Sequence, residues 1–249
     1  IGSGLVGSEM CIRDSNYTVN DDNQNVEQLV SWDVSDMLVN YGFVCGSVTI
    51  GGESGDDNTK LSADKDLLKK SLTEFVKLRD EFGIVRAETT LDSCADLFAQ
   101  GKLAYTITDV SHLNTIAESG ISYGVCSIPA LSDDMQIENI SENLCAFVNP
   151  YSSDVQTAKA VANAMSYDYA AAVNSTTGLL SSRTISINSK EYKDTYGKIY
   201  EIYSKADDKA KFMGAAYFYT KFDIMLHQVW DGTDIETSVN SFLSELKVQ

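Results

Sequence analysis

The chain has 249 residues, with 19 basic and 36 acidic side chains and a formal net charge of −17 at pH 7. This excess of carboxylates excludes nucleic-acid binding through phosphate neutralisation, which requires clustered Lys and Arg. The hydrophobic fraction of 43% and the aromatic fraction of 10% are typical of a globular protein. No stretch approaches the roughly 18 uninterrupted apolar residues of a membrane-spanning helix. These numbers predict a folded chain with an acidic surface.

The first fifteen residues, IGSGLVGSEMCIRDS, differ from the rest of the sequence. They lack an initiating Met, a basic start and an unbroken apolar run, so they are not a secretory signal. The string resembles translated sequencing-adapter read-through of the kind found in assembled metagenomic reading frames. We therefore expect residues 1–15 to be a non-native leader on a metagenomic fragment and leave them out of the fold prediction.

The next hundred residues alternate turn signals with helical periodicity. Residues 26–43 indicate mixed helix or loop, and residues 46–59, which contain GGESGDDN, indicate turns. A helix is predicted over residues 62–83, because its apolar residues recur at helical spacing and its first turn is acidic. A shorter helix, beginning at Thr90 or Asp92, follows it.

A strand–helix–strand unit comes next. Gly101 fits the left-handed end of the preceding helix, and the alternating apolar residues of 103–107 predict a short strand. Asp109 or Ser111 then caps a helix that stops at the next glycine. A second strand is expected over residues 123–129.

The last hundred residues are mainly helical. A strand is expected at 144–149, and helices are expected at 154–165, 167–173, 209–230 and 235–246, with an aromatic stripe of tyrosines between 192 and 203. Many helices around a few short strands predict an α/β fold.

The pattern F-x-x-G-K-x-A-x-x-I, polar turn, helix, Y-G-V-x-x-x-P runs through residues 98–129. It resembles the carboxy-terminal lobe of the extracellular solute-binding proteins of ABC importers, in their maltose- and oligosaccharide-binding branch (family 1). The resemblance covers nearly all of residues 26–249 and rests on spacing. It implies a two-lobe α/β fold, periplasmic-binding-protein-like (type II), with an incomplete amino-terminal lobe.

The same resemblance divides the chain into lobes. The segment LCAFVNP at 144–150, followed by a helix, is similar to the family's return crossing into the amino-terminal lobe. This similarity implies that residues 16–143 and 199–249 build the carboxy-terminal lobe and that residues 144–198 are a returning segment of the amino-terminal lobe. Such a segment normally packs on strands and helices of its own lobe, so exposed apolar side chains are expected near residues 144–180.

Sugar sites combine aromatic rings, which stack on C–H faces, with polar groups at loop ends. By the resemblance, the aromatic candidates for ligand binding are Trp32, ahead of a glycine turn, and Tyr217 or Tyr219, before Gly232. Because residues two apart on a helix diverge, one of the two tyrosines is expected to face the ligand, and Tyr219 is favoured. For Trp32 the alternative is a core position.

The polar turn after the strand at 103–107 supplies the other candidates, Asp109, Ser111 and His112. Amide N–H groups and side chains converge on a ligand at such a strand-to-helix turn. Maltose-binding relatives carry Gly-Pro-Trp at this turn, so the resemblance does not extend to maltose specificity. For His112 the alternative is a role as a surface cap.

These features predict a substrate-binding component of an ABC transporter that captures a sugar or oligosaccharide between two lobes. The resemblance implies ABC permease transmembrane subunits as partners, an extracytoplasmic location as a lipoprotein or periplasmic protein, and a monomer without a cofactor. Polyamines or metal chelates are alternative ligands. The alternative classes are a carbohydrate-active enzyme or glycan-binding module, and an acidic protein-binding scaffold.

The sequence contains none of the catalytic motifs G-x-S-x-G, H-E-x-x-H, the Walker loop or G-x-G-x-x-G, so we do not expect an enzyme. With two His residues and no C-x-x-C pair, it has no zinc-ligand spacing, and no metal site is expected. Cys126 and Cys145 either form a bridge between neighbouring strands or are buried free thiols, and the sequence leaves both open.

Overall fold

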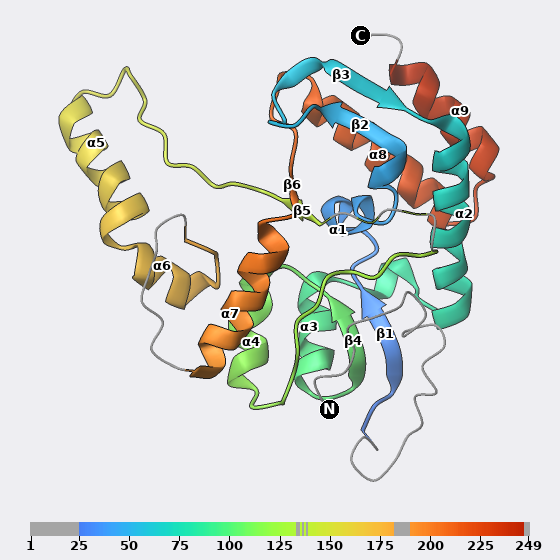
Figure 1. Cartoon of the computed structure of the whole chain (residues 1–249), viewed down its shortest axis with the longest axis horizontal. Coiled ribbons are helices and arrows are strands. Elements are labelled where there is room, and N and C mark those ends of the chain that lie inside the picture. The colour runs from blue at the N-terminus through green and yellow to red at the C-terminus, as the bar shows by residue number, and fades with distance from the viewer. Residues whose placement is uncertain (1–24, 133–134, 136, 138, 182–189, 247–249) are drawn as a thin grey trace.

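A computed structural model describes residues 25–132, 135, 137, 139–181 and 190–246 (Figure 1). The predicted leader at residues 1–15 lies outside this described part. Within it, the order of elements is mixed α/β, as the sequence predicts. No helix in the described ranges has the length and apolar character needed to cross a bilayer.

The elements in chain order are β1 (Gln28–Trp32), α1 (Met37–Tyr41), β2 (Val48–Gly51), β3 (Asp57–Ala63), α2 (Lys65–Phe82), α3 (Leu91–Ala99), β4 (Leu103–Ile107), the 3-10 turn η3 (Val110–His112), α4 (Leu113–Glu118), β5 (Ile140–Ser141), α5 (Val155–Asn163), α6 (Ala170–Thr177), α7 (Lys190–Tyr203), β6 (Asp207–Asp208), α8 (Ala215–Trp230) and α9 (Ile235–Leu246).

The described strands pair two by two. β1 and β4 are parallel, with Val30 opposite Tyr105 and Trp32 opposite Ile107, so their carboxyl ends lie side by side. β2 and β3 form an antiparallel hairpin, and β5 and β6 form a short parallel pair. The β1–β4 pair therefore brings the loop after residue 32 next to the polar turn after residue 107.

Local sequence signals place α2, α3 and α9 where helices were predicted, whereas α6 lies a few residues later than the predicted helix at 167–173. The Asp64 side chain caps α2 by accepting from the Leu67 amide, and Gly83, at φ 64°, ends the helix in the left-handed region. Thr90 caps α3 in a reciprocal capping box. α9 coincides with the predicted 235–246 helix.

The main core lies where α2, α8 and α9 meet behind the β2–β3 hairpin (Figure 1). Aromatic side chains dominate it: the Phe75 and Trp230 rings have centroids 4.9 Å apart, and Phe222 stacks on Phe218 at 5.6 Å. Two arginines hold the carboxyl end of α8, because Arg79 donates to the Trp230 carbonyl and Arg86 donates twice to the Asp231 carboxylate.

Helices α5 and α6 stand apart from this core, connected to it by an extended segment (Figure 1). Apolar side chains on this segment and these helices are exposed: Leu144, Phe147, Tyr151, Val161, Met165, Tyr167, Tyr169 and Val173. Phe147 is 89% exposed and Tyr151 is 92% exposed. The prediction of exposed apolar side chains near residues 144–180 is confirmed.

Two predicted strands are wrong. Residues 123–129 and 144–149 contain no strand, because no described neighbour pairs with them. Conversely, β1 forms inside 26–43 and β3 forms partly inside 46–59, where loops or turns were predicted. α8 starts later than predicted, because Gly214, at φ 106°, breaks the run before Ala215.

The thiols also differ from the sequence alternatives. Cys126 and Cys145 are free and exposed, whereas Cys45 and Cys94 are free and buried. Burial also raises the pKa of the Cys94 thiol, despite a hydrogen bond to Ser31.

Candidate functional site

The candidate site is the edge of the β1–β4 pair where both strands end. In open parallel sheets, ligands bind at the carboxyl ends of the strands. The loop after β1 carries Asp33, and the turn after β4 carries Asp109, Ser111 and His112. The amino-terminal end of α3 joins them, because the Leu91 amide donates to Asp33 Oδ2 at 3.1 Å.

Asp109 organises the turn. Its Oδ1 accepts from the Ser111 amide at 2.9 Å and from the Ser111 hydroxyl at 2.6 Å. Burial raises the pKa of Asp109, but the hydrogen bonds from Ser111 and His112 together lower it by more than burial raises it. The pKa of Asp109 is therefore below its ordinary value. Asp109 is therefore an ionised acceptor in this turn at neutral pH.

His112 lies between two carboxylates. Its Nδ1 is 2.9 Å from Asp109 Oδ1, and its Nε2 is 2.9 Å from Asp92 Oδ1. Burial lowers the pKa of His112, but the hydrogen bonds with Asp92 and Asp109 raise it more, so the net pKa is above its ordinary value. His112 is therefore not only a surface cap, because its side chain is 15% exposed and contacts carboxylates of two elements.

The loop after α6 packs directly on this turn. Gly178, at φ 73°, lies so close that a side-chain carbon there would overlap the Val110 carbonyl oxygen. Nearby, the Asn114 amide donates to the Ser175 carbonyl at 3.1 Å. The polar turn is thus in contact with the segment that carries α5 and α6.

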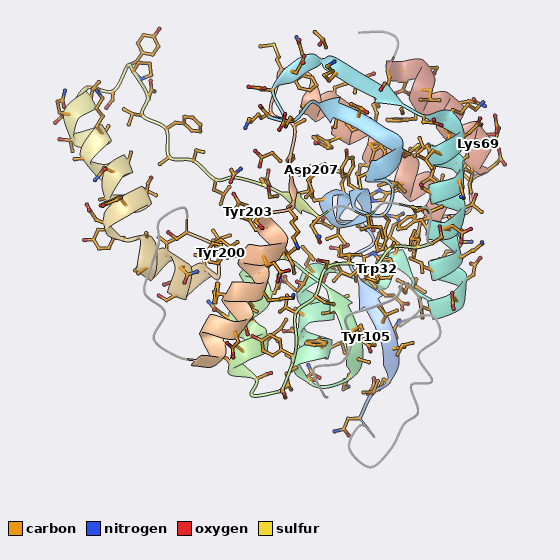
Figure 2. All side chains as sticks on the ribbon, in the orientation of Figure 1. Trp32, Lys69, Tyr105, Tyr200, Tyr203 and Asp207 are labelled. Atoms are coloured by element: carbon orange, nitrogen blue, oxygen red, sulfur yellow. The ribbon has the colours of Figure 1, made fainter. Side chains whose placement is uncertain are left out.

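Trp32 lies in the interior of the molecule beside this edge (Figure 2). It is 1% exposed, its indole N–H donates to Asn40 Oδ1 at 2.9 Å, and the centroid of its ring lies 5.9 Å from that of Trp230. The predicted stacking role is replaced by a packing role in this structure, because the ring offers no free face to a ligand.

The two candidate tyrosines on α8 point in different directions, as the helical spacing predicts. Tyr219 is 6% exposed, and its hydroxyl accepts from the Ala210 amide at 2.9 Å, so the favoured candidate is a core residue here. Tyr217 is 39% exposed, with the Lys221 ammonium 5.4 Å from its ring centroid. Of the two rings, Tyr217 is the one that a ligand can reach.

The structure brings together three of the six predicted residues, Asp109, Ser111 and His112. It adds two carboxylates that the sequence analysis missed, Asp33 and Asp92. Asp92 comes twenty residues before His112 and faces it because β4 packs back along α3, which brings the start of α3 next to the turn after β4. In the described ranges, no three side chains of His, Cys, Asp or Glu are placed to hold a metal ion.

Comparison with solved structures identifies the fold. The chain superposes on the maltose/maltodextrin-binding domain of Bdellovibrio bacteriovorus bound to maltotriose with a TM-score of 0.72 at 13% identity, covering 100% of this chain and 68% of that one. The maltotriose-binding protein of Thermus thermophilus gives a TM-score of 0.68 at 14% identity, covering 88% and 61%. The fold is that of type II periplasmic binding proteins.

A third neighbour of this fold is the maltose-maltodextrin-binding protein of Alicyclobacillus acidocaldarius, with a TM-score of 0.69 at 13% identity over 91% of this chain and 63% of that one. The chain thus spans only 61% to 68% of the length of these structures. The names of all three describe binding proteins or a binding domain. No protein-family profile matches the sequence, and no curated protein sequence matches it.

Proposed function

We propose that the chain is part of a substrate-binding component of an ABC importer, which captures a sugar or oligosaccharide and delivers it to a membrane permease. The observation that carries this proposal is the match of 88% to 100% of the chain to sugar-binding proteins solved with maltotriose. The polar turn at the carboxyl edge of β1 and β4 supports it, because this is where open parallel sheets bind ligands.

The proposed ligand contacts are the carboxylates and hydroxyl of this turn, together with the reachable ring of Tyr217. Ionised carboxylates accept hydrogen bonds from sugar hydroxyls, and a tyrosine ring stacks on a sugar's C–H face. Capture proceeds by closure of two lobes around the ligand, a motion known for periplasmic binding proteins. An extracytoplasmic, lipid-anchored or periplasmic location is part of the same proposal.

The lobe assignment is a further part of this proposal. Residues 16–143 and 199–249 build the carboxy-terminal lobe, and residues 144–198 belong to the amino-terminal lobe. The exposed apolar side chains of α5 and the segment before it support this division, since such side chains normally pack against a partner surface.

A ligand screen tests the proposed function. Thermal unfolding of the full chain is followed with maltotriose, other oligosaccharides, monosaccharides, polyamines and amino acids. A ligand that binds the folded state raises the melting temperature with its concentration. We expect a rise with one class of sugar, which His112→Ala and Tyr217→Ala reduce and the exposed control Met213→Ala leaves unchanged.

If only a polyamine raises the melting temperature, the ligand is a cation rather than a sugar, which the acidic side chains of the site would also bind. Turnover of a glycan during the assay would instead indicate a carbohydrate-active enzyme. If the chain binds none of these compounds, the sugar-carrier proposal is wrong.

A further inference from the structure

The side chain of His112 joins two elements that are distant in sequence. Its two ring nitrogens each lie 2.9 Å from a carboxylate oxygen, one on Asp109 and one on Asp92. An ionised carboxylate accepts hydrogen bonds and cannot donate them, and a neutral imidazole has one N–H. Both contacts are hydrogen bonds only when both ring nitrogens are protonated, so the geometry corresponds to a charged imidazolium.

The two carboxylates are not held equally. Asp109 also accepts from the amide and hydroxyl of Ser111, so it keeps its place without the histidine. The Asp92 side chain is 91% exposed, and the described residues offer it no other hydrogen-bond donor than His112. Loss of a proton from His112 leaves one N–H for two carboxylates. When Nε2 is the nitrogen that loses it, Asp92 has no donor, and the side-chain link between the first turn of α3 and the turn after β4 is broken.

We propose that Asp92 is a positioning residue of the ligand site, and that protonated His112 links α3 to the Asp109 turn in a pH-dependent manner. The role in ligand binding rests on the proposed function, whereas the link itself does not. With both ring nitrogens occupied, the turn presents carboxylate oxygens to a ligand. When Nε2 loses its proton, that nitrogen becomes an acceptor and the Asp92 side chain is no longer held by the turn.

The charged groups around His112 support a simple titration. Asp92 faces it from α3 and Asp109 from its own turn, and Asp33 accepts from the amide of Leu91, the residue before Asp92. α6, whose carboxyl end packs on this turn, has no charged side chain, and α4 has one charged residue, at its last position. α7 packs on Val110 and Leu113 through the apolar Tyr196 and Ile199, and its Lys198 is paired with Glu201. Because the pKa of His112 is raised in the folded chain, the link is intact below that pKa and is lost as the pH rises through it.

The test is an NMR titration of the histidine ring protons in the full chain, with His227→Gln to assign the two histidine signals. Asp92→Asn removes one carboxylate from the link. Asp96→Asn removes the same charge from an exposed position further along α3 and serves as the matched control. We expect the pKa of His112 to fall in Asp92→Asn and to stay unchanged in Asp96→Asn. Protection of the first-turn amides of α3 against exchange, relative to their intrinsic exchange rate at each pH, should fall above that pKa in the wild type and in Asp96→Asn but not in Asp92→Asn.

An unchanged His112 titration in Asp92→Asn would overturn the link, as would a His112 pKa below the ordinary histidine value in the wild type. A second experiment tests the role in ligand binding by measuring the affinity for maltotriose at pH values below and above the measured pKa of His112. A pH step in affinity that Asp92→Asn removes and Asp96→Asn keeps supports the positioning role, and maltotriose binding without such a step refutes it. If the histidine titration confirms the link but no sugar binds, the link stands and the result counts against the proposed function alone.

Discussion

Replacing Trp32 separates a core role from a ligand-stacking role. The ring is 1% exposed and packs on Phe43 and Trp230, with centroids 5.5 and 5.9 Å away. Truncating a buried aromatic side chain to Ala removes its transfer free energy and leaves a cavity, at a cost of about 3–5 kcal/mol. The free energy of unfolding of a single domain is about 5–15 kcal/mol, so Trp32→Ala should remove a large part of the stability.

A second substitution isolates the indole hydrogen bond. Trp32→Phe keeps most of the ring but removes the donor to Asn40 Oδ1, and Asn40 is itself 1% exposed. A buried acceptor without a partner costs about 1–3 kcal/mol. The Asn40 amide keeps its own bond to the Val34 carbonyl, so the amide stays in position and the cost stays within that range.

The assay is equilibrium urea unfolding followed by fluorescence, with Met213→Ala, at a position that is 99% exposed, as the control, for which a change in the free energy of unfolding within about 0.5 kcal/mol is expected. We expect the urea midpoint to fall most in Trp32→Ala, by less in Trp32→Phe, and very little in the control. A Trp32→Ala chain that unfolds like the wild type but no longer binds sugar would refute the packing argument and restore the stacking role.

Three further outcomes follow from the structure. Gly178 and Gly83 both have φ > 0, but only Gly178 faces a carbonyl oxygen, that of Val110. Gly178→Ala should therefore destabilise the fold by more than the roughly 1 kcal/mol expected for Gly83→Ala. Equal urea midpoints of the two variants would contradict this. Hydrogen bonds from two lysines of α2 lower the pKa of Glu236 to about 2. The stability that ionised Glu236 contributes is therefore present above its ordinary pKa of 4.5 and is lost as the pH falls towards 2. Acid unfolding curves should show this loss in the wild type and not in Glu236→Gln. Tyr219→Phe should cost about 1–3 kcal/mol in urea unfolding, because a buried backbone amide loses its acceptor, and an unchanged midpoint would show that the amide finds another partner.

The helices were the predictable part of the fold, because their signals are local. A helix needs a cap, a periodic apolar face and a stop, all within a few turns of sequence. Asp64 and Gly83 supply the cap and stop of α2, and Thr90 supplies the cap of α3. The turn that follows β4 was predictable for the same reason, since Asp109 caps it over two residues.

The strands were less predictable, because a strand is stable only when another segment supplies its hydrogen-bond partners. Residues 28–32 form β1 because β4 pairs with them from more than seventy positions away. Residues 144–149 have a sequence that suits a strand but have no partner among the described residues, and so they stay extended and exposed.

The sequence by itself determined the α/β class, the helices and the three polar residues of the β4 turn, because capping and periodicity act over a few residues. Only the tertiary structure decided how those residues are surrounded. It buried Trp32 and Tyr219, left Tyr217 exposed, and placed Asp92 against His112. The physical reason is that burial and pairing are set by segments that meet in space, and parallel strand pairing brings together residues whose separation in sequence carries no local signal.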